Sequence, residues 1–472
     1  MTTTKRRGAR RPEPRRSRIP VLLGMVLVAV FTVSIGLGWY ALRGANQRPV
    51  ATGPNVVVLV LDGMDLWTWQ RLPELRALLA GRTFSNAFVT DPESSPSRVS
   101  MLTGQYPHNN GVLSDEEPIG GFGRSVRNRV QHRTIQGALH DAGYRTALVG
   151  EYLAGYGDAA IHAAANVAAD YVPPNWDRWY ALAGGLPSAG PAINADGTLM
   201  HPTGSLTDDL ADQAVAFMTD ATSPASYFLW LAPPAPSGTL GPAPDKPVKA
   251  KLPPREKDAS DKPQVLQRLA AEKPAVIADL QRQRLESMAS VTSLVQRVLA
   301  AMDDNTYLIV TAATGYRLGQ NGLPAGTGSA YEPDLRVPLV IIGPGVKVEE
   351  DSRLALNLDI APTIADLAGV TLDENPDGLS LLDPPDEARD AFAVEHEATS
   401  TIPYYRALRQ VGGVLYVEWQ DGSTELYHLA DDPPQDHNLA TAERANALYG
   451  EEMTTLADRL HALTDCAGAS CR

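Results

Sequence analysis

Cysteine is almost absent from the sequence. The only two cysteines, Cys466 and Cys471, lie at the extreme C-terminus. Neither has a histidine or a cationic partner linked to it by a motif, which argues against a catalytic thiolate. Outside the cytoplasm the pair is expected to form a short local disulfide, worth roughly 2 kcal/mol, and two free thiols are the alternative.

Basic charge is scarce once the N-terminal tail is passed. The first 20 residues hold eight lysines and arginines and one acidic residue. The rest of the chain has 33 basic and 54 acidic residues and a formal charge of −21. Such an acidic chain is not expected to bind nucleic acid, and it would repel a highly sulfated polyanion at long range.

Several common signatures of catalysis are also missing. The nine histidines show no His-Glu-x-x-His spacing or other metal-binding pattern. The sequence has no nucleophile elbow of a serine hydrolase and no Walker loop with usable spacing. Internal repeats are absent as well, which argues against a repeat architecture.

An uncharged apolar segment of 22 residues runs from residue 21 to residue 42. As a helix it would be about 33 Å long, enough to cross a hydrocarbon core of about 30 Å. The basic tail at residues 1–20 then places the N-terminus in the cytoplasm. We therefore expect a single-pass cell-membrane protein with a linker at residues 43–53 and an extracytoplasmic main domain. A cleaved signal peptide is the alternative, but its apolar region is usually about 7 to 15 residues long.

The pattern of residues 54–390 is typical of an α/β domain. Residues 55–61, NVVVLVL, form an apolar β-branched run that ends at Asp62, as a buried parallel strand does. The carboxyl ends of such strands are where ligands bind in open α/β sheets. Proline and lysine dominate residues 241–262, which predicts an exposed excursion. Further strands are expected at residues 145–149, 226–231, 307–311 and 337–342, and helices at residues 72–79, 133–142, 205–218, 275–302 and 359–368.

Residues 391–472 have a different sequence pattern. Residues 404–419 and 425–429 predict short antiparallel strands, with turn residues between them. Residues 443–463 predict a terminal helix, which is followed by the cysteine pair. We therefore expect a smaller C-terminal subdomain of the α+β type.

The stretch at residues 91–111, DPESSPSRVSMLTGQYPHNNG, is the strongest candidate for a functional site. It reads as a polar turn with two prolines that enters a helix, and a helix N-terminus suits an anion. Arg98 could add a bidentate fork for sulfate or phosphate, and Ser94 is the candidate nucleophile. The alternative is that the serines of this stretch are only capping and turn residues.

The same stretch resembles the signature of the sulfatase family, in the alkaline-phosphatase superfamily. PSRVSMLTGQYPHNNGV is similar to its Cys-x-Pro-x-Arg and Leu-Thr-Gly-x-Tyr-Pro motif, and PNVVVLVLDG, YEPDLRVPLVIIGPGV and TELYHLADDPPQDHNLA follow the family order. Within the family, the sequence resembles bacterial glucosamine-6-sulfatase-like enzymes and arylsulfatases. The resemblance implies a large mixed, mostly parallel sheet flanked by helices, with the smaller antiparallel sheet after it. It also places Ser94 at the position of the residue that is matured to formylglycine and Arg98 at that of the motif arginine.

The resemblance also implies a calcium ion and cations around the sulfate, and here the sequence departs from the family. Of the first pair of metal-binding acids only Asp62 remains, because Gly63 holds the second place. Ala313 and Thr314 stand where the family has its second metal-binding pair. The cations of the family are replaced as well, by Glu151, Ser237 and Thr327. Calcium takes about six to eight oxygen ligands, so binding of the family type is not expected.

Three functions are compatible with these residues. The first is a membrane-anchored sulfatase-fold protein, catalytically impaired or inactive, that binds a glycan or an envelope protein and holds no cofactor. In this case Arg98 is expected to pair with Asp62 or Glu151 in a structural ion pair. The alternative is an active hydrolase of sulfuric or phosphoric esters, with calcium and with Ser94 as formylglycine precursor or direct nucleophile. A third reading is an ectodomain that positions a partner through its acidic surface.

Overall fold

The computed structural model describes residues 1–2, 48–184, 192–236, 249–254, 259–269, 272–372, 374–384, 389–441 and 445–472. The expected membrane anchor at residues 21–42 lies outside the described residues, as do nearly all of the basic tail and residues 43–47 of the linker. Ser237 lies outside them too. Among the helices that the structure describes, none combines the length and the apolar character needed to cross a bilayer. Val50–Arg472 forms one compact unit.

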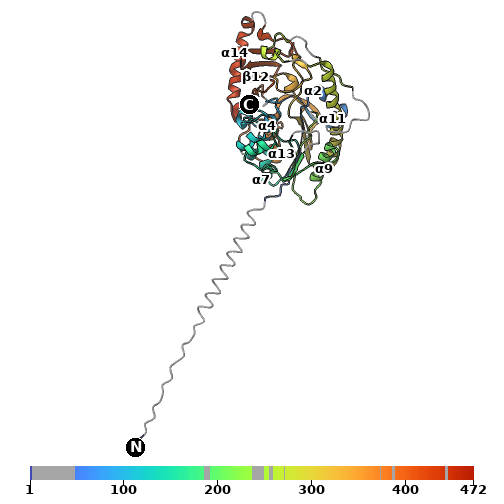
Figure 1. The fold of residues 1–472 in the computed structure, drawn as a ribbon, viewed down its shortest axis with the longest axis vertical. Coiled ribbons are helices and arrows are strands. Elements are labelled where there is room, and N and C mark those ends of the chain that lie inside the picture. The colour runs from blue at the N-terminus through green and yellow to red at the C-terminus, as the bar shows by residue number, and fades with distance from the viewer. Residues whose placement is uncertain are drawn as a thin grey trace. The chain divides into compact units, whose positions relative to one another are not determined.

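A ten-stranded mixed sheet forms the centre of this unit (Figure 1). The apolar run of the first strand pairs in parallel with a strand on each side, so its carboxyl end meets theirs at one edge. Parallel pairs make up the middle of the sheet, and antiparallel pairs occur near its two ends. The strand order is β10 (Glu349–Leu356), β2 (Arg82–Phe88), β9 (Val340–Ile342), β8 (Thr306–Ala312), β1 (Asn55–Leu61), β7 (Tyr227–Ala232), β3 (Arg145–Gly150), β4 (Arg178–Ala183), β5 (Ala192–Ala195) and β6 (Thr198–Met200).

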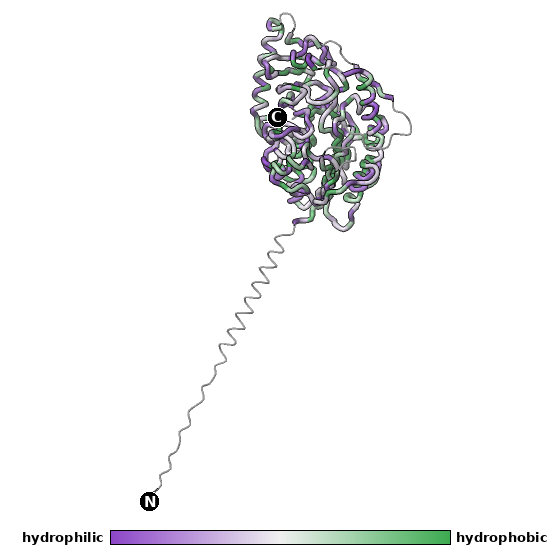
Figure 2. Tube along the Cα trace, in the orientation of Figure 1, coloured by the Kyte–Doolittle hydropathy of each residue, from purple (hydrophilic) through white to green (hydrophobic). Residues whose placement is uncertain are grey.

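Helices cover both faces of the sheet, and the alternation of side chains along β1 explains why. Val56, Val58 and Val60 face one hydrophobic core, and the residues between them face the other. The first core contains α4 (Ser94–Thr103), α7 (Ile135–Asp141) and α13 (Ile360–Ala368). The second contains α9 (Leu206–Met218) and the long α11 (Pro274–Ala301), which lie side by side (Figure 1). Hydrophobic residues follow the central strands in Figure 2.

Short helices and turns connect these elements, and the last two of the 3₁₀ turns lie in the C-terminal residues. Those with α-helical geometry are α2 (Leu66–Trp69), α3 (Pro73–Leu78), α5 (Pro107–Asn110), α6 (Gly121–Arg127), α8 (Ala159–Ala164), α10 (Gln264–Gln267) and α12 (Glu332–Leu335). The 3₁₀ turns are η1 (Val130–His132), η2 (Gln320–Gly322), η3 (Asn357–Asp359), η5 (Leu439–Thr441) and η6 (Gly468–Cys471).

The C-terminal residues form a second, four-stranded antiparallel sheet. Its order is β11 (Ala391–His396), β12 (Tyr405–Gln410), β13 (Val414–Trp419) and β14 (Thr424–His428), and α14 (Ala445–Thr464) packs on it. The expected antiparallel subdomain sheet is confirmed, but β11 had no counterpart among the predicted strands. The expected disulfide between Cys466 and Cys471 is present. The mixed sheet with helices on both faces confirms the expected α/β class, although the strand predicted at residues 337–342 is shorter and begins only at Val340.

Candidate active site

Four of the predicted site residues meet at the carboxyl edge of the sheet. Asp62 follows β1, Glu151 follows β3, and α4 supplies Ser94 and Arg98 from one face because they are four residues apart. The hydroxyl of Ser94 donates a hydrogen bond to Asp62 Oδ1 over 2.8 Å. The parallel strands therefore bring together residues that are up to 89 positions apart in the sequence.

Arg98 is the cation of this cluster, and its charge is met by two carboxylates. Arg98 is 2% exposed. One terminal nitrogen lies 2.7 Å from Glu151 Oε2 and 3.3 Å from Asp62 Oδ1, and the other donates to the backbone carbonyl of Glu151. The ion pair expected for Arg98 thus forms with both acids rather than with one. An external anion would have to compete with these carboxylates for the guanidinium.

The N-terminus of α4 is likewise met by a carboxylate of the chain itself. The backbone N–H groups of Ser94 and Ser95 donate to the two oxygens of Asp115, over 3.2 and 2.6 Å. A carboxylate is favoured here because free N–H groups and the positive end of the helix dipole point at it. Sequence reasoning missed Asp115, since it lies outside the 91–111 stretch and no spacing links it to Ser94.

Burial, and then the excess of acids over cations, raises the pKa values of two acids of this cluster. Burial, and then the negative charge of Asp62, raise the pKa of Glu151 to about 7, while Arg98 acts in the opposite direction. Burial also raises the pKa of Asp115. Both pKa values rise because a further negative charge is unfavourable in this buried place. The negative charge of a sulfate or phosphate ester would be unfavourable there for the same reason.

The positions of the expected second metal pair lie near Asp62 but offer little to a cation. β8 runs beside β1 with Ala312 opposite Leu61, and the N–H of Ala313 donates to the carbonyl of Leu61 over 3.1 Å. Ala313 is fully buried and has no side-chain oxygen. Gly63 has a φ of 68°, a left-handed conformation that suits glycine. These residues do not fit the calcium site that the resemblance implies, because Arg98 already lies against Asp62.

Thr314 and Thr327, the remaining substituted positions, have structural surroundings. Thr314 is buried two residues after the end of β8. The carbonyl of Thr327 accepts a hydrogen bond from Arg317, which is ion-paired with the buried Asp334. The contact that Thr327 makes is therefore a structural one, between its carbonyl and the side chain of Arg317.

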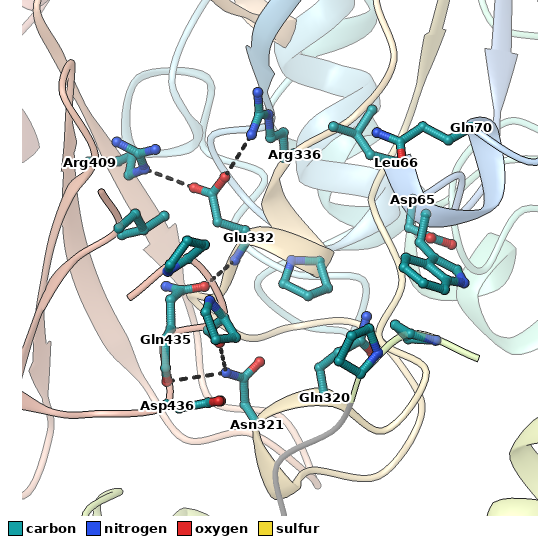
Figure 3. A pocket seen from close by; sticks show the side chains of 17 residues that line it. Asp65, Leu66, Gln70, Gln320, Asn321, Glu332, Arg336, Arg409, Gln435 and Asp436 are labelled. Atoms are coloured by element: carbon teal, nitrogen blue, oxygen red, sulfur yellow. Dashed lines mark hydrogen bonds and ion pairs between the residues drawn. The ribbon is translucent and has the colours of Figure 1, made fainter. Parts of the chain in front are cut away.

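A cavity of about 610 Å³ opens at another place, between the loop after β1 and the C-terminal sheet (Figure 3). Glu332 lies at its centre, where its carboxylate is 2.8 Å from Arg409 and 3.5 Å from Arg336. Gln435 accepts a hydrogen bond from the backbone of Glu332. Because one carboxylate serves both arginines, this cavity presents no free cation to an anionic ligand among the residues drawn in Figure 3.

The fold and the motif at α4 can now be compared with known proteins. A sequence profile of the Sulfatase family matches residues 54–370, which is more than half of the chain. The chain belongs to the sulfatase family. The human N-acetylglucosamine-6-sulfatase is 28% identical to it over 99% of this chain and 92% of the human protein. An arylsulfatase of Volvox carteri is 29% identical over 92% of this chain and 78% of its own length.

Solved structures agree with this sulfatase-family assignment at the level of the fold. A protein solved with its substrate D-glucosamine-2-N,6-O-disulfate superposes with a TM-score of 0.69, at 18% identity, over 87% of this chain and 97% of its own. The phosphonate monoester hydrolase of Agrobacterium radiobacter gives a TM-score of 0.66 at 20% identity, over 87% and 95% of the two chains. The alkaline-phosphatase-like architecture expected from the sequence is therefore confirmed.

Proposed function

We propose that this sulfatase-family chain is a catalytically impaired or inactive member that acts by binding at the cell envelope. One observation carries the proposal: both groups suited to an anion are engaged by the chain's own carboxylates. Glu151 and Asp62 form ion pairs with Arg98, and Asp115 accepts hydrogen bonds from the N–H groups that begin α4. The chain's own carboxylates therefore occupy the places that a bound anion would take.

The electrostatics oppose a sulfate ester in this place. Two like charges about 4 Å apart repel by about 4 kcal/mol at an effective dielectric constant near 20. An incoming sulfate would meet Asp62, Asp115 and Glu151 with a single compensating cation, Arg98. Binding would require protonation or displacement of at least one of these carboxylates.

An active hydrolase is the second candidate, and the contact between Ser94 and Asp62 favours it. The 2.8 Å separation is within reach for a general base. In this reading Asp62 takes the hydroxyl proton, Ser94 Oγ bonds to the sulfur or phosphorus, and the ester oxygen leaves with the bond electrons. Arg98 would hold a nonbridging oxygen of the ester, after release from Glu151.

Turnover of an aryl sulfate and an aryl phosphate by the full-length protein separates the two candidates. We expect rates within about threefold of the buffer blank and no change in Ser94→Ala, because neither anion-binding group is available. Ser352→Ala, at an exposed position of β10, is the matched control. Peptide mass spectrometry of residue 94 is expected to find unmodified serine. Formylglycine at residue 94, or turnover that disappears in Ser94→Ala alone, would establish the hydrolase instead.

The location and the partner are further parts of the proposal. The apolar run at residues 21–42 supports an anchor, and the names of the relatives suggest an amino-sugar glycan, uncharged because the chain is acidic. An envelope protein is the other partner class. We expect the full-length chain to stay in membranes washed at alkaline pH, and those membranes to retain more N-acetylglucosamine polymer than membranes without the chain. Release of the chain into the wash contradicts the anchor, and equal retention contradicts the glycan.

A further inference from the structure

Three buried residues with metal-binding side chains lie together beside the start of α4. Asp91 and Glu93 come from the loop before the helix, and His396 is the last residue of β11. One ligand atom from each of the three lies within 4.8 Å of the others. The residues are 1%, 5% and 0% exposed, so water does not solvate them as it solvates a surface cluster.

Each carboxylate uses one oxygen for a fixed hydrogen bond and leaves the other without a partner. Asp91 Oδ1 accepts from the N–H of Glu93 over 2.8 Å. Glu93 Oε2 accepts from the hydroxyl of Ser114 and the N–H of Asp115, over 3.0 and 2.7 Å. Asp91 Oδ2, Glu93 Oε1 and both ring nitrogens of His396 make no hydrogen bond of good geometry within the described part of the chain, although His396 Nδ1 lies 3.2 Å from Glu93 Oε1 and the backbone of Ile402 is near the ring. Such outer hydrogen bonds orient a metal ligand and leave its second oxygen available.

A fourth buried polar group faces the same region. The ring of Tyr405 stacks on His396 with centroids 5.1 Å apart, and its hydroxyl has no hydrogen-bond partner among the described residues. The negative charge of Asp91 adds to burial in raising the pKa of Tyr405, which places the hydroxyl within electrostatic reach of that carboxylate. Buried polar groups without partners are uncommon in folded proteins, and several around one point indicate a missing common partner.

We propose that Asp91, Glu93 and His396 bind a divalent first-row transition metal ion, with Zn²⁺ as the representative. One imidazole nitrogen and two carboxylate oxygens suit zinc and its neighbours, whereas calcium and magnesium take oxygen ligands. Two carboxylates balance the charge of the dication. The charges of two arginines reach His396, and each arginine is itself ion-paired, Arg406 with Glu397 and Arg317 with Asp334.

This site is separate from the position of the family's metal and does not depend on the proposed function. It would join the loop before α4 to β11, and so hold Glu93, which fixes Ser114 and Asp115 next to Ser94. The competing arrangement is a proton shared between Glu93 and His396, whose Oε1 and Nδ1 are 3.2 Å apart. Without a cation, burial raises the pKa of Asp91 well above its usual range and that of Glu93 to about 8. The metal therefore competes with protons for these ligands.

Metal analysis of the full-length protein, after chelation, reloading with Zn²⁺ and gel filtration, tests the proposal. We expect about one zinc per chain, and a rise of the thermal midpoint on addition of Zn²⁺ because the ion binds only the folded state. His396→Phe keeps an aromatic ring beside Tyr405 and Glu93→Gln keeps the shape of the side chain. Both are expected to lose the zinc and the midpoint shift. His428→Gln, in strand β14 at the opposite edge of the same sheet, is the control and should keep both.

X-ray absorption at the zinc edge gives a readout that does not depend on any variant. We expect nitrogen and oxygen ligands at about 2.0 to 2.2 Å with the outer-shell scattering of one imidazole. Folded protein with less than a tenth of an equivalent of zinc after reloading would overturn the proposal in favour of the shared proton. Equal zinc in His396→Phe and the natural protein, or stoichiometric Ca²⁺ in place of Zn²⁺, would overturn it as well.

Discussion

Replacing Asp359 with alanine is expected to lower the free energy of unfolding by about 3 to 5 kcal/mol, because it leaves the guanidinium of Arg389 buried without a counter-ion. The two side chains are each 1% exposed and are joined by two parallel hydrogen bonds of 2.6 and 2.8 Å. Asp359 also accepts from the backbone N–H groups of Leu356 and Leu379, over 2.7 and 2.9 Å. One substitution therefore removes the partners of four donors at the start of α13.

Urea unfolding followed by circular dichroism measures this change. Asp366→Ala, on the exposed side of the same helix, is the matched control and should stay within about 0.5 kcal/mol of the natural protein. Asp359→Asn keeps oxygen and shape but loses the charge, and should lie between the two. If Asp359→Ala unfolds at the same urea concentration as Asp366→Ala, the buried pair does not hold β10 and α13 to the segment before β11.

The second large effect is expected at Glu425, in the C-terminal sheet. Its residue is fully buried and accepts hydrogen bonds from Tyr331 over 2.8 Å, from Trp419 over 2.7 Å and from Tyr427. Tyr427 also accepts from the buried ammonium group of Lys262, over 2.8 Å. Glu425→Ala removes the acceptor of three donors and a buried negative charge that interacts with Lys262, whose other carboxylate partner is Asp261 at 3.9 Å. We expect a loss of about 3 kcal/mol or more in the free energy of unfolding.

A double-mutant cycle with Lys262 shows whether the charge or the hydrogen bonds dominate. If the buried charge dominates, Lys262→Met should restore part of the stability of Glu425→Ala, since the double variant removes both fully buried charges and leaves only the partly exposed Asp261 without its ion pair. Glu425→Gln retains an acceptor oxygen and should be less destabilised than Glu425→Ala. Strictly additive effects of Glu425→Ala and Lys262→Met would contradict the coupling between the two groups.

Lys262 departs from one interpretation of the sequence at a single position, the last residue of a segment of which residues 241–248 and 255–258 lie outside the described residues. Residues 241–262 are rich in proline and lysine and predict an exposed excursion, yet the side chain of Lys262 is 0% exposed. It donates to the carbonyl of Gln435 over 2.5 Å as well as to Tyr427. Composition could not indicate this, because the acceptors lie more than 160 residues further along the chain.

Much of the fold could be predicted because it depends on local patterns. The alternating and β-branched runs give the period of strands, and the run at residues 55–61 lies in the middle of the sheet as expected. The long helical spacing at residues 275–302 corresponds to α11. β11 was missed because AFAVEH is short and fully buried, so it shows no alternation.

The candidate site was predicted only in part. The motif placed Ser94 and Arg98 on one turn of a helix, and the strand end placed Asp62 near them. Asp115 could not be found in this way, because its role comes from a turn that folds back on the N-terminus of α4. His396 was equally hidden, since it is 303 residues from Glu93 in the sequence.

The sequence by itself determined the sulfatase family and the α/β class, because contiguous motifs and short-range periodicity carry that information. It also determined which positions depart from the family pattern. Only the tertiary structure decided what those departures do. Glu151 and Asp115 engage the groups that suit an anion, and Glu93 meets His396, because folding brings charged groups from distant segments into one water-poor place. There each charge must find a partner within a few ångströms, and no local pattern states which partner that is.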